Sequence, residues 1–157
     1  MIPRAHDRRG WSWVIAQGIL GFAMLLAPRR GPEWSFETRL AGFFLALPLA
    51  IVGAWLMLAG ALYLGRSFTP LPRPREDGQL VRTGLFRVVR HPIYAGAILL
   101  AWSWTLLRAS LLHAVIALAI VVLLDAKARR EERWLVERYP EYRSYQRQVA
   151  RLIPWLY

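Results

Sequence analysis

The longest uncharged run in the chain constrains its fold more than any other feature. Residues 40–64 form a stretch of 25 positions without Asp, Glu, Lys or Arg. A helix needs about 20 mainly apolar residues to cross the hydrocarbon core of a bilayer. Pro48 can kink this helix, while Gly53 and Gly60 allow a neighbouring helix to approach closely. The run therefore predicts a transmembrane helix.

An earlier apolar run, residues 11–27, follows a basic segment that contains three arginines. Signal peptides have the same order, but the end of this run lacks the small-x-small pattern of a cleavage site. Trp11 and Trp13 at its start are of the type found at the level of the lipid headgroups. We therefore expect a retained transmembrane helix, and residues 1–64 are expected to form a two-helix scaffold.

Two shorter apolar runs, residues 93–107 and 109–124, are separated only by Arg108. This spacing predicts a helical hairpin with Arg108 at its turn. Together with the first two runs, the hairpin makes an all-α, integral-membrane bundle of about four transmembrane helices. Residues 65–157, which include the hairpin, are expected to form the functional core.

The last apolar run is expected to continue as a helix beyond the membrane. Residues 125–139 contain no Gly or Pro and are rich in Ala, Arg, Glu and Leu, which are good helix formers. A helix over residues 111–139 is about 43 Å long, whereas the hydrocarbon core is about 30 Å thick. Pro140 ends this helix. The tail that follows is expected to cap the bundle at the membrane surface.

The net charge of +11 comes almost entirely from arginine, because Lys127 is the only lysine. The positive residues gather in the N-terminal segment, in residues 65–90 and in the tail. Since basic loops face the cytoplasm, we expect both termini and the cap on the cytoplasmic side of an inner or plasma membrane. Charges that flank apolar spans predict anionic membrane lipids as partners rather than nucleic acid.

The loop before the hairpin, residues 65–90, contains prolines and a turn signal. Pro70, Pro72 and Pro74 occupy alternate positions, which favours an extended backbone, and Asp77-Gly78 indicates a turn. A loop of this length beside a membrane is more often functional than a plain connection.

The residue types exclude several kinds of site. There is no cysteine, and hence no disulfide, no thiolate nucleophile and no cysteine-ligated metal. His113 lies in an apolar run without a second histidine or a carboxylate at helical spacing. No metal site is expected.

Two polar clusters are expected to meet on the cytoplasmic side. Arg90 and His91 precede Pro92, a residue suited to the first turn of a helix, where free N–H groups favour an anion. Glu131 and Glu132 lie on the protruding part of the last long helix. Across a hairpin the clusters become neighbours that can hold a zwitterion. On the residues alone, Arg90 and His91 are equally well explained as membrane anchors, and a solvated helix face is the favoured explanation of Glu131 and Glu132.

Four motifs follow one another along the second half of the chain. They are LVRTG at 80–84, RHPIYAG at 90–96, EERWL at 131–135, and YRSY at 142–145 followed by Val149 and Pro154. This series resembles the isoprenylcysteine carboxyl methyltransferase family and the related membrane phospholipid methyltransferases. The resemblance covers about residues 65–157. Leu85-Phe86 departs from the Pro-Tyr of many relatives, which affects the shape of that loop.

The resemblance implies a membrane-embedded pocket for S-adenosylmethionine, with S-adenosylhomocysteine as product, that opens to the cytoplasm. It also implies which residues contact, line or shape that pocket: Leu80, Val81, His91, Tyr94, Gly96, Glu131 and Glu132.

The implied acceptor is lipophilic or lipidated and enters from the bilayer. It is a carboxylate of the isoprenylcysteine kind or a lipid amine. A carboxylate needs an arginine to orient it, for which Arg90, Arg87 and Arg151 are the candidates. An amine needs a base that takes its proton.

Two alternatives remain open from the residues. One is a membrane reductase similar to the steroid-reductase family, which shares an RHP-type motif and uses NADPH. The other is a non-catalytic membrane scaffold. The Glu131-Glu132 pair favours the methyltransferase over the reductase.

Overall fold

The computed structural model describes residues 10–74 and 77–157, and in this part of the chain all regular structure is helical apart from one isolated β-bridge. Its elements are α1 (Trp11–Leu26), α2 (Phe36–Leu64), η2 (Gly65–Ser67), η3 (Gly84–Arg87), α3 (Pro92–Arg108), α4 (Leu111–Arg138) and α5 (Tyr142–Gln148). The all-α prediction is confirmed. The expected basic residues Arg4, Arg8, Arg9 and Arg75 lie outside the described residues.

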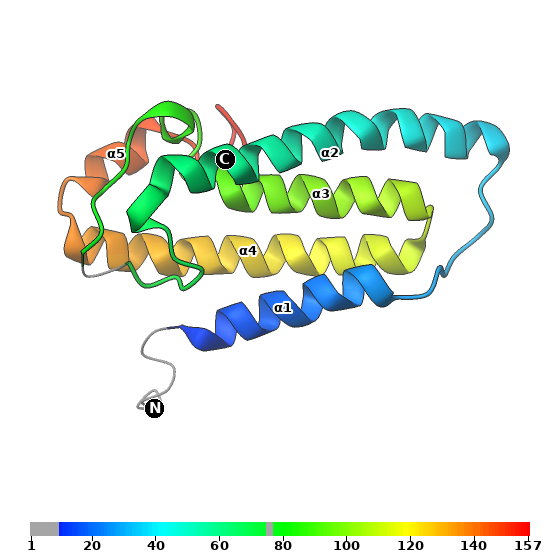
Figure 1. Ribbon diagram of the computed structural model, residues 1–157, viewed down its shortest axis with the longest axis horizontal. Coiled ribbons are helices and arrows are strands. Elements are labelled where there is room, and N and C mark those ends of the chain that lie inside the picture. The colour runs from blue at the N-terminus through cyan, green and yellow to red at the C-terminus, as the bar shows by residue number, and fades with distance from the viewer. Residues whose placement is uncertain (1–9, 75–76) are drawn as a thin grey trace.

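The four long helices lie side by side in the order α2, α3, α4, α1 (Figure 1). α3 and α4 form the expected antiparallel hairpin, α2 packs along α3, and α1 packs along α4. α5 and the loop that contains η3 gather at the end of the bundle where α3 begins and α4 finishes. As expected, α4 continues without a break well beyond the apolar run.

The chain reverses direction between α3 and α4 in a tight turn at Ala109 and Ser110. Ala109 adopts a left-handed conformation with φ 44°, and its N–H donates to the Leu106 carbonyl at 3.1 Å. The Ser110 hydroxyl then donates to the Arg30 carbonyl at 2.9 Å and accepts from the Arg30 N–H at 3.0 Å. The loop between α1 and α2 is thereby attached to the hairpin.

α2 and α3 approach each other through small residues. A Cβ atom placed on Gly96 would lie 2.5 Å from the Gly53 carbonyl oxygen, and one on Gly53 would lie 2.8 Å from the Gly96 carbonyl oxygen. Further along, the Ser103 hydroxyl donates to the Ala46 carbonyl at 2.8 Å. Small residues and a polar bond of this kind are typical of helix packing in membranes. The expectation of close contact at Gly53 is confirmed.

The outward faces of the helices are apolar. Exposed side chains include Phe22, Phe43, Phe44, Leu62 and Val122, and such an extended apolar surface suits a bilayer rather than water. Two helical segments, Phe36–Ser67 and Leu111–Arg138, are long and apolar enough to cross a membrane. α1 and α3, with 16 and 17 residues, reach only about 25 Å at a rise of about 1.5 Å per residue.

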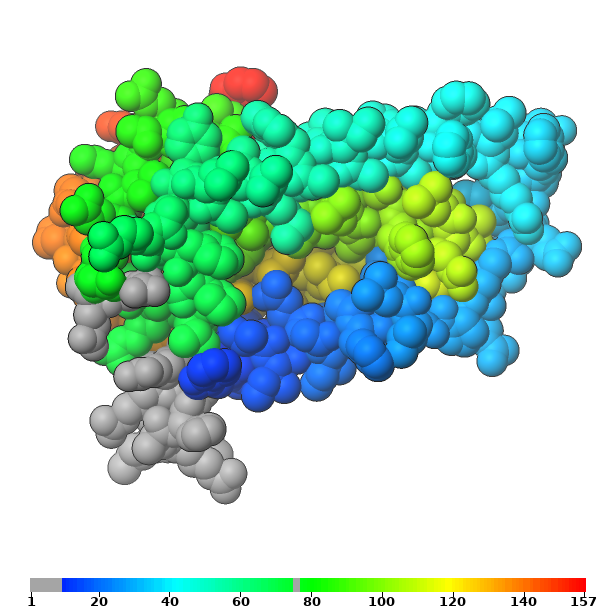
Figure 2. Space-filling view, viewed as in Figure 1, coloured from blue at the N-terminus to red at the C-terminus, as the bar shows by residue number. Residues whose placement is uncertain are grey.

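α1 and α2 do not lie against each other along the face seen in Figure 2. The blue α1 and the cyan α2 are separated there, and atoms of α3 and α4 are visible between them. On this side α3 and α4 are therefore exposed between the two outer helices.

Candidate functional site

A cavity of about 420 Å³ lies at the end of the bundle where α3 begins and α4 finishes, which we call the polar end. All four long helices and the loop after α2 contribute to its wall. The residues from the first two helices are Val14, Gln17, Gly18, Met57 and Leu64. These helices were expected to be a scaffold, and they also form part of the cavity.

The start of α3 is fixed in place by the C-terminal tail. Pro92 occupies the first turn of α3, as expected. The Arg90 N–H donates to the Ala150 carbonyl at 2.8 Å, and the His91 N–H donates to the Arg151 carbonyl at 3.1 Å. These bonds accompany a short parallel bridge between Val89 and Ala150. The tail therefore holds the two residues that precede α3.

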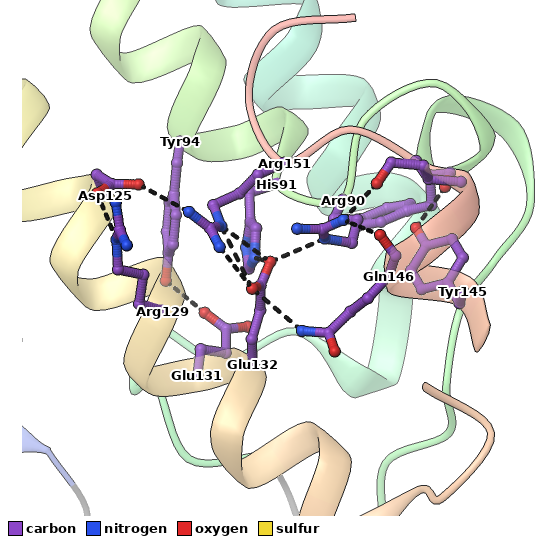
Figure 3. Close-up of polar contacts among 12 residues, drawn as sticks. Arg90, His91, Tyr94, Asp125, Arg129, Glu131, Glu132, Tyr145, Gln146 and Arg151 are labelled. Atoms are coloured by element: carbon purple, nitrogen blue, oxygen red, sulfur yellow. Dashed lines mark hydrogen bonds and ion pairs between the residues drawn. The ribbon is translucent and has the colours of Figure 1, made fainter. Parts of the chain in front are cut away.

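Glu132 is the centre of an ionic cluster (Figure 3). Arg90 Nε lies 2.8 Å from Glu132 Oε1, and His91 Nε2 lies 3.2 Å from the same oxygen. Arg151 Nη2 and Gln146 Nε2 each lie 3.2 Å from Glu132 Oε2. The Glu132 side chain is 5% exposed. The prediction that the Arg90-His91 and glutamate clusters are neighbours is confirmed.

The ionised form of the Glu132 side chain is strongly favoured. Burial by itself would raise the pKa of this carboxyl, but the hydrogen bonds from His91 and Arg151 and the positive charge of Arg90 outweigh burial and lower the pKa to about 2. Glu132 lies two turns beyond Leu124, where the uncharged run of α4 ends. It is therefore a carboxylate at any physiological pH.

Arg90 lines the cavity, but it is held mainly by other groups of the protein. Besides its ion pair with Glu132, its Nη1 donates to the Gln146 carbonyl at 2.7 Å and to the Val149 carbonyl. A guanidinium with these contacts connects α3, α4 and α5 to one another. Its Nε and Nη1 atoms are thus occupied within the protein, whereas the sequence had suggested that Arg90 would be free to hold a ligand.

The neighbouring Glu131 faces the cavity instead. Tyr94 OH donates to Glu131 Oε2 at 2.7 Å, and the imidazole of His91 stacks on the Tyr94 ring with 5.2 Å between the ring centroids and 4° between the planes. All three residues line the cavity. A carboxylate, a phenol and an imidazole from α3 and α4 therefore converge on one wall.

Lys127 is a site residue that the sequence reasoning missed. Its side chain is nearly fully buried and lines the cavity. Nζ donates to Gln17 Oε1 at 2.7 Å and to the Pro70 carbonyl at 3.0 Å, and it lies 5.2 Å from the centroid of the Tyr94 ring. One signal was present in the sequence: a single lysine among arginines, one helical turn before Glu131.

The remaining predicted residues fall in different places. Leu80 and Val81 line the cavity. Gly96 packs against Gly53 in the contact between α2 and α3. Arg87 is exposed on η3, and Arg151 lines a second hollow of about 340 Å³ beside the tail.

Tyrosines that the sequence reasoning did not assign complete the cavity wall. Tyr142 and Tyr145 from α5 line it, and Tyr145 OH donates to the Phe86 carbonyl. Tyr139 OH donates to the Gly78 carbonyl at 2.6 Å. These bonds attach the loop between α2 and α3 to the end of α4 and to α5.

The chain is similar in sequence to known proteins. The phospholipid methyltransferase family matches residues 41–142. A methanethiol S-methyltransferase from Pseudomonas deceptionensis is 30% identical over an alignment of 167 residues. The alignment covers 99% of this chain and 62% of that protein. Methanethiol S-methyltransferase 1 from Bradyrhizobium diazoefficiens is 36% identical over 93 residues, which cover 59% of this chain and 30% of that protein.

A solved structure shares the fold. The eukaryotic intramembrane Ras methyltransferase, an isoprenylcysteine carboxyl methyltransferase, matches with a TM-score of 0.67 and 21% identity, over 98% of this chain and 55% of that one. The chain spans less than two thirds of each of these three proteins.

Proposed function

Because this chain belongs to the phospholipid methyltransferase family, we propose that it transfers a methyl group from S-adenosylmethionine to a small apolar thiol such as methanethiol. Two relatives are named as methanethiol S-methyltransferases. The observation that carries the proposal is the cavity itself, which has an ionic wall at Lys127 and Glu131 and apolar surface elsewhere, including Val14, Met57 and Leu80. A sulfonium zwitterion and an apolar thiol need surfaces of these two kinds.

The residues present fit the methyl donor. The cavity of about 420 Å³ lies within the range of about 300–1,000 Å³ usual for small-molecule sites. When bound, S-adenosylmethionine supplies an activated methyl group on a positively charged sulfur. Leu80, Val81, Tyr94 and Glu131 would hold the donor, since all of them line the cavity. Gly96 would act by keeping α3 close to α2.

His91 is the residue that we assign to the proton of the thiol. With its Nε2–H donating to Glu132, the other ring nitrogen is an acceptor, and the carboxylate fixes the orientation of the ring. This pairing of a histidine with a buried carboxylate is a common arrangement for a general base. Glu132 would then serve the reaction through His91, without touching either substrate.

A thiol acceptor also agrees with the state of the arginines. Arg90 and Arg151 are paired with Glu132, and Arg87 is exposed on η3. An acceptor carboxylate would have to compete with Glu132 for its orienting arginine, whereas a thiol needs none. Among the three candidates, Arg90 keeps a supporting role by holding Glu132 in place.

A lipophilic acceptor with a carboxylate or an amine is the second candidate. It is favoured by Gly18, which is exposed on α1 and also lines the cavity. A long-chain acceptor would enter sideways from the bilayer beside Gly18. In that case methyl transfer would prefer lipid over methanethiol.

We further propose that the chain crosses the membrane four times, with the cavity on the cytoplasmic side. The basic residues Arg66, Arg82, Arg143 and Arg147 all belong to the polar end of the bundle. Because the chain has no cysteine, single cysteines at Ser144 and Ser35 can be labelled from either side of sealed vesicles. Labelling of Ser144→Cys from outside right-side-out cell-derived vesicles would reverse the proposed orientation.

A binding and turnover experiment on the purified protein in detergent tests the proposed function. S-adenosylhomocysteine is expected to bind and to raise the melting temperature, and NADPH is expected to do neither. With labelled methyl donor, methanethiol is expected to give labelled dimethyl sulfide. Binding of NADPH alone would contradict the proposal, and label found only in extracted lipid would favour the second candidate.

A further inference from the structure

Lys127 has an unusual environment for an ammonium group. It is 2% exposed, and among the described residues its hydrogen bonds go to the neutral oxygens of Gln17 and Pro70. A buried charge is costly unless it is well paired. The cation–π contact with Tyr94 compensates for part of this cost. An ammonium has three N–H donors, so these two bonds leave one donor for a ligand in the cavity.

A carboxylate lies one helical turn away on the same face of α4. Lys127 and Glu131 are four positions apart, both line the cavity, and both contact Tyr94. Side chains at this spacing are neighbours on a helix. Together they present a cation and an anion side by side, which is the pattern complementary to an α-amino acid zwitterion.

We propose that Lys127 binds the carboxylate of the amino-acid end of the methyl donor while Glu131 binds its ammonium group. The inference rests on the proposed function and assigns the polar end of its donor site. Arg90 does not serve this purpose, because its guanidinium is held by Glu132 and by two backbone carbonyls. Lys127 is thus the cation of the ligand clamp, and Arg90 belongs to the structural cluster.

Ligand analogues separate the two halves of this clamp. S-adenosylhomocysteine carries both the carboxylate and the ammonium group, and its decarboxylated analogue keeps only the amine. A hydrogen-bonded charge pair is worth about ten- to a hundredfold in affinity. Wild-type protein is therefore expected to bind S-adenosylhomocysteine about ten- to a hundredfold more tightly than the decarboxylated analogue by titration calorimetry.

Variants at Lys127 give the decisive comparison. Lys127→Met removes the charge, and Lys127→Gln also removes it but keeps a donor for the Pro70 carbonyl. Both are expected to lose affinity for S-adenosylhomocysteine and to bind the decarboxylated analogue as the wild type does. Glu131→Gln is expected to weaken the binding of both ligands. Arg133→Met removes an exposed cation from the same helix and serves as the matched control.

The outcomes are distinct. Unchanged affinity for S-adenosylhomocysteine in both Lys127 variants overturns the inference and leaves the proposed function intact. The same holds if the Lys127 variants lose equal affinity for S-adenosylhomocysteine and for its decarboxylated analogue. If Lys127→Met does not fold, the affinities of Lys127→Gln and of the wild type for the two ligands still test the inference. Failure of the wild type to bind S-adenosylhomocysteine overturns the inference together with the proposed function.

Discussion

Arg90 Nε lies 2.8 Å from Glu132 Oε1 although the two residues are 42 positions apart in the sequence. This ion pair connects the start of α3 to the polar end of α4, and Arg90 then reaches the α5 region through the Gln146 carbonyl. The residues around Glu132 therefore hold the end of the bundle together. Glu131, the adjacent residue, is left to face the cavity.

The first prediction concerns the stability of this cluster. Glu132→Gln keeps the shape of the side chain but leaves Arg90 and Arg151 without their buried carboxylate, which is expected to destabilise the fold by about 3–5 kcal/mol. Thermal unfolding in detergent measures the change. Glu137→Gln, at an exposed position of α4, is the control and is expected to change stability by less than about 0.5 kcal/mol. Equal melting temperatures for the two variants would contradict the structural role of Glu132.

The second prediction concerns acid. The pKa of Glu132 is lowered from 4.5 to about 2, so its contribution is fully present above about pH 4.5. As the pH falls below that value, the unfolded chain takes up a proton that the folded protein does not, and up to about 3 kcal/mol is lost by about pH 2. The stability difference between wild type and Glu132→Gln is expected to shrink between pH 5 and pH 3. A difference that stays constant over this range would argue against the lowered pKa.

The third prediction concerns access to the cavity. Gly18 lines the cavity, and a Cβ atom built on it meets no other atom within 4 Å. Gly18→Phe is therefore expected to fold and to block the proposed entry beside Gly18, with kcat/KM falling at least about tenfold for a long-chain acceptor and less for methanethiol. Gly21→Phe is the matched control, because Gly21 is equally uncrowded and lies one turn further along α1. Equal effects of both substitutions would place the entrance elsewhere.

The fourth prediction concerns the contact between α2 and α3. The Cβ atom of Gly96→Ala would lie 2.5 Å from the Gly53 carbonyl oxygen, which forces the helices apart and is expected to cost about 1–3 kcal/mol. Gly21→Ala, which adds a methyl group in open space, is expected to be neutral or slightly stabilising. The melting temperatures of the two variants measure the difference. A wild-type melting temperature for Gly96→Ala would show that this contact is looser than described.

The helices could be predicted from the sequence because the signals are local. The uncharged run at 40–64, the hairpin around Arg108 and the helix-forming stretch at 125–139 each depend on neighbouring residues. The motifs likewise identified the family and brought His91 and the glutamates to attention. Burial, pairing and the cavity wall depend on residues from several helices, and no local pattern contains them.

The all-α bundle, its hairpin and the meeting of the two polar clusters could be read from local patterns of residues. The direction in which each member of a cluster faces depends instead on how the helices pack. Successive residues of a helix point about 100° apart, so Glu132 turns into the ionic cluster while Glu131 turns to the cavity. The same geometry places Lys127 one turn before Glu131 on the cavity side, where α1 and the loop after α2 enclose it. Helix rotation and packing, which distant contacts fix, therefore separate the residues that support the site from those that face a ligand.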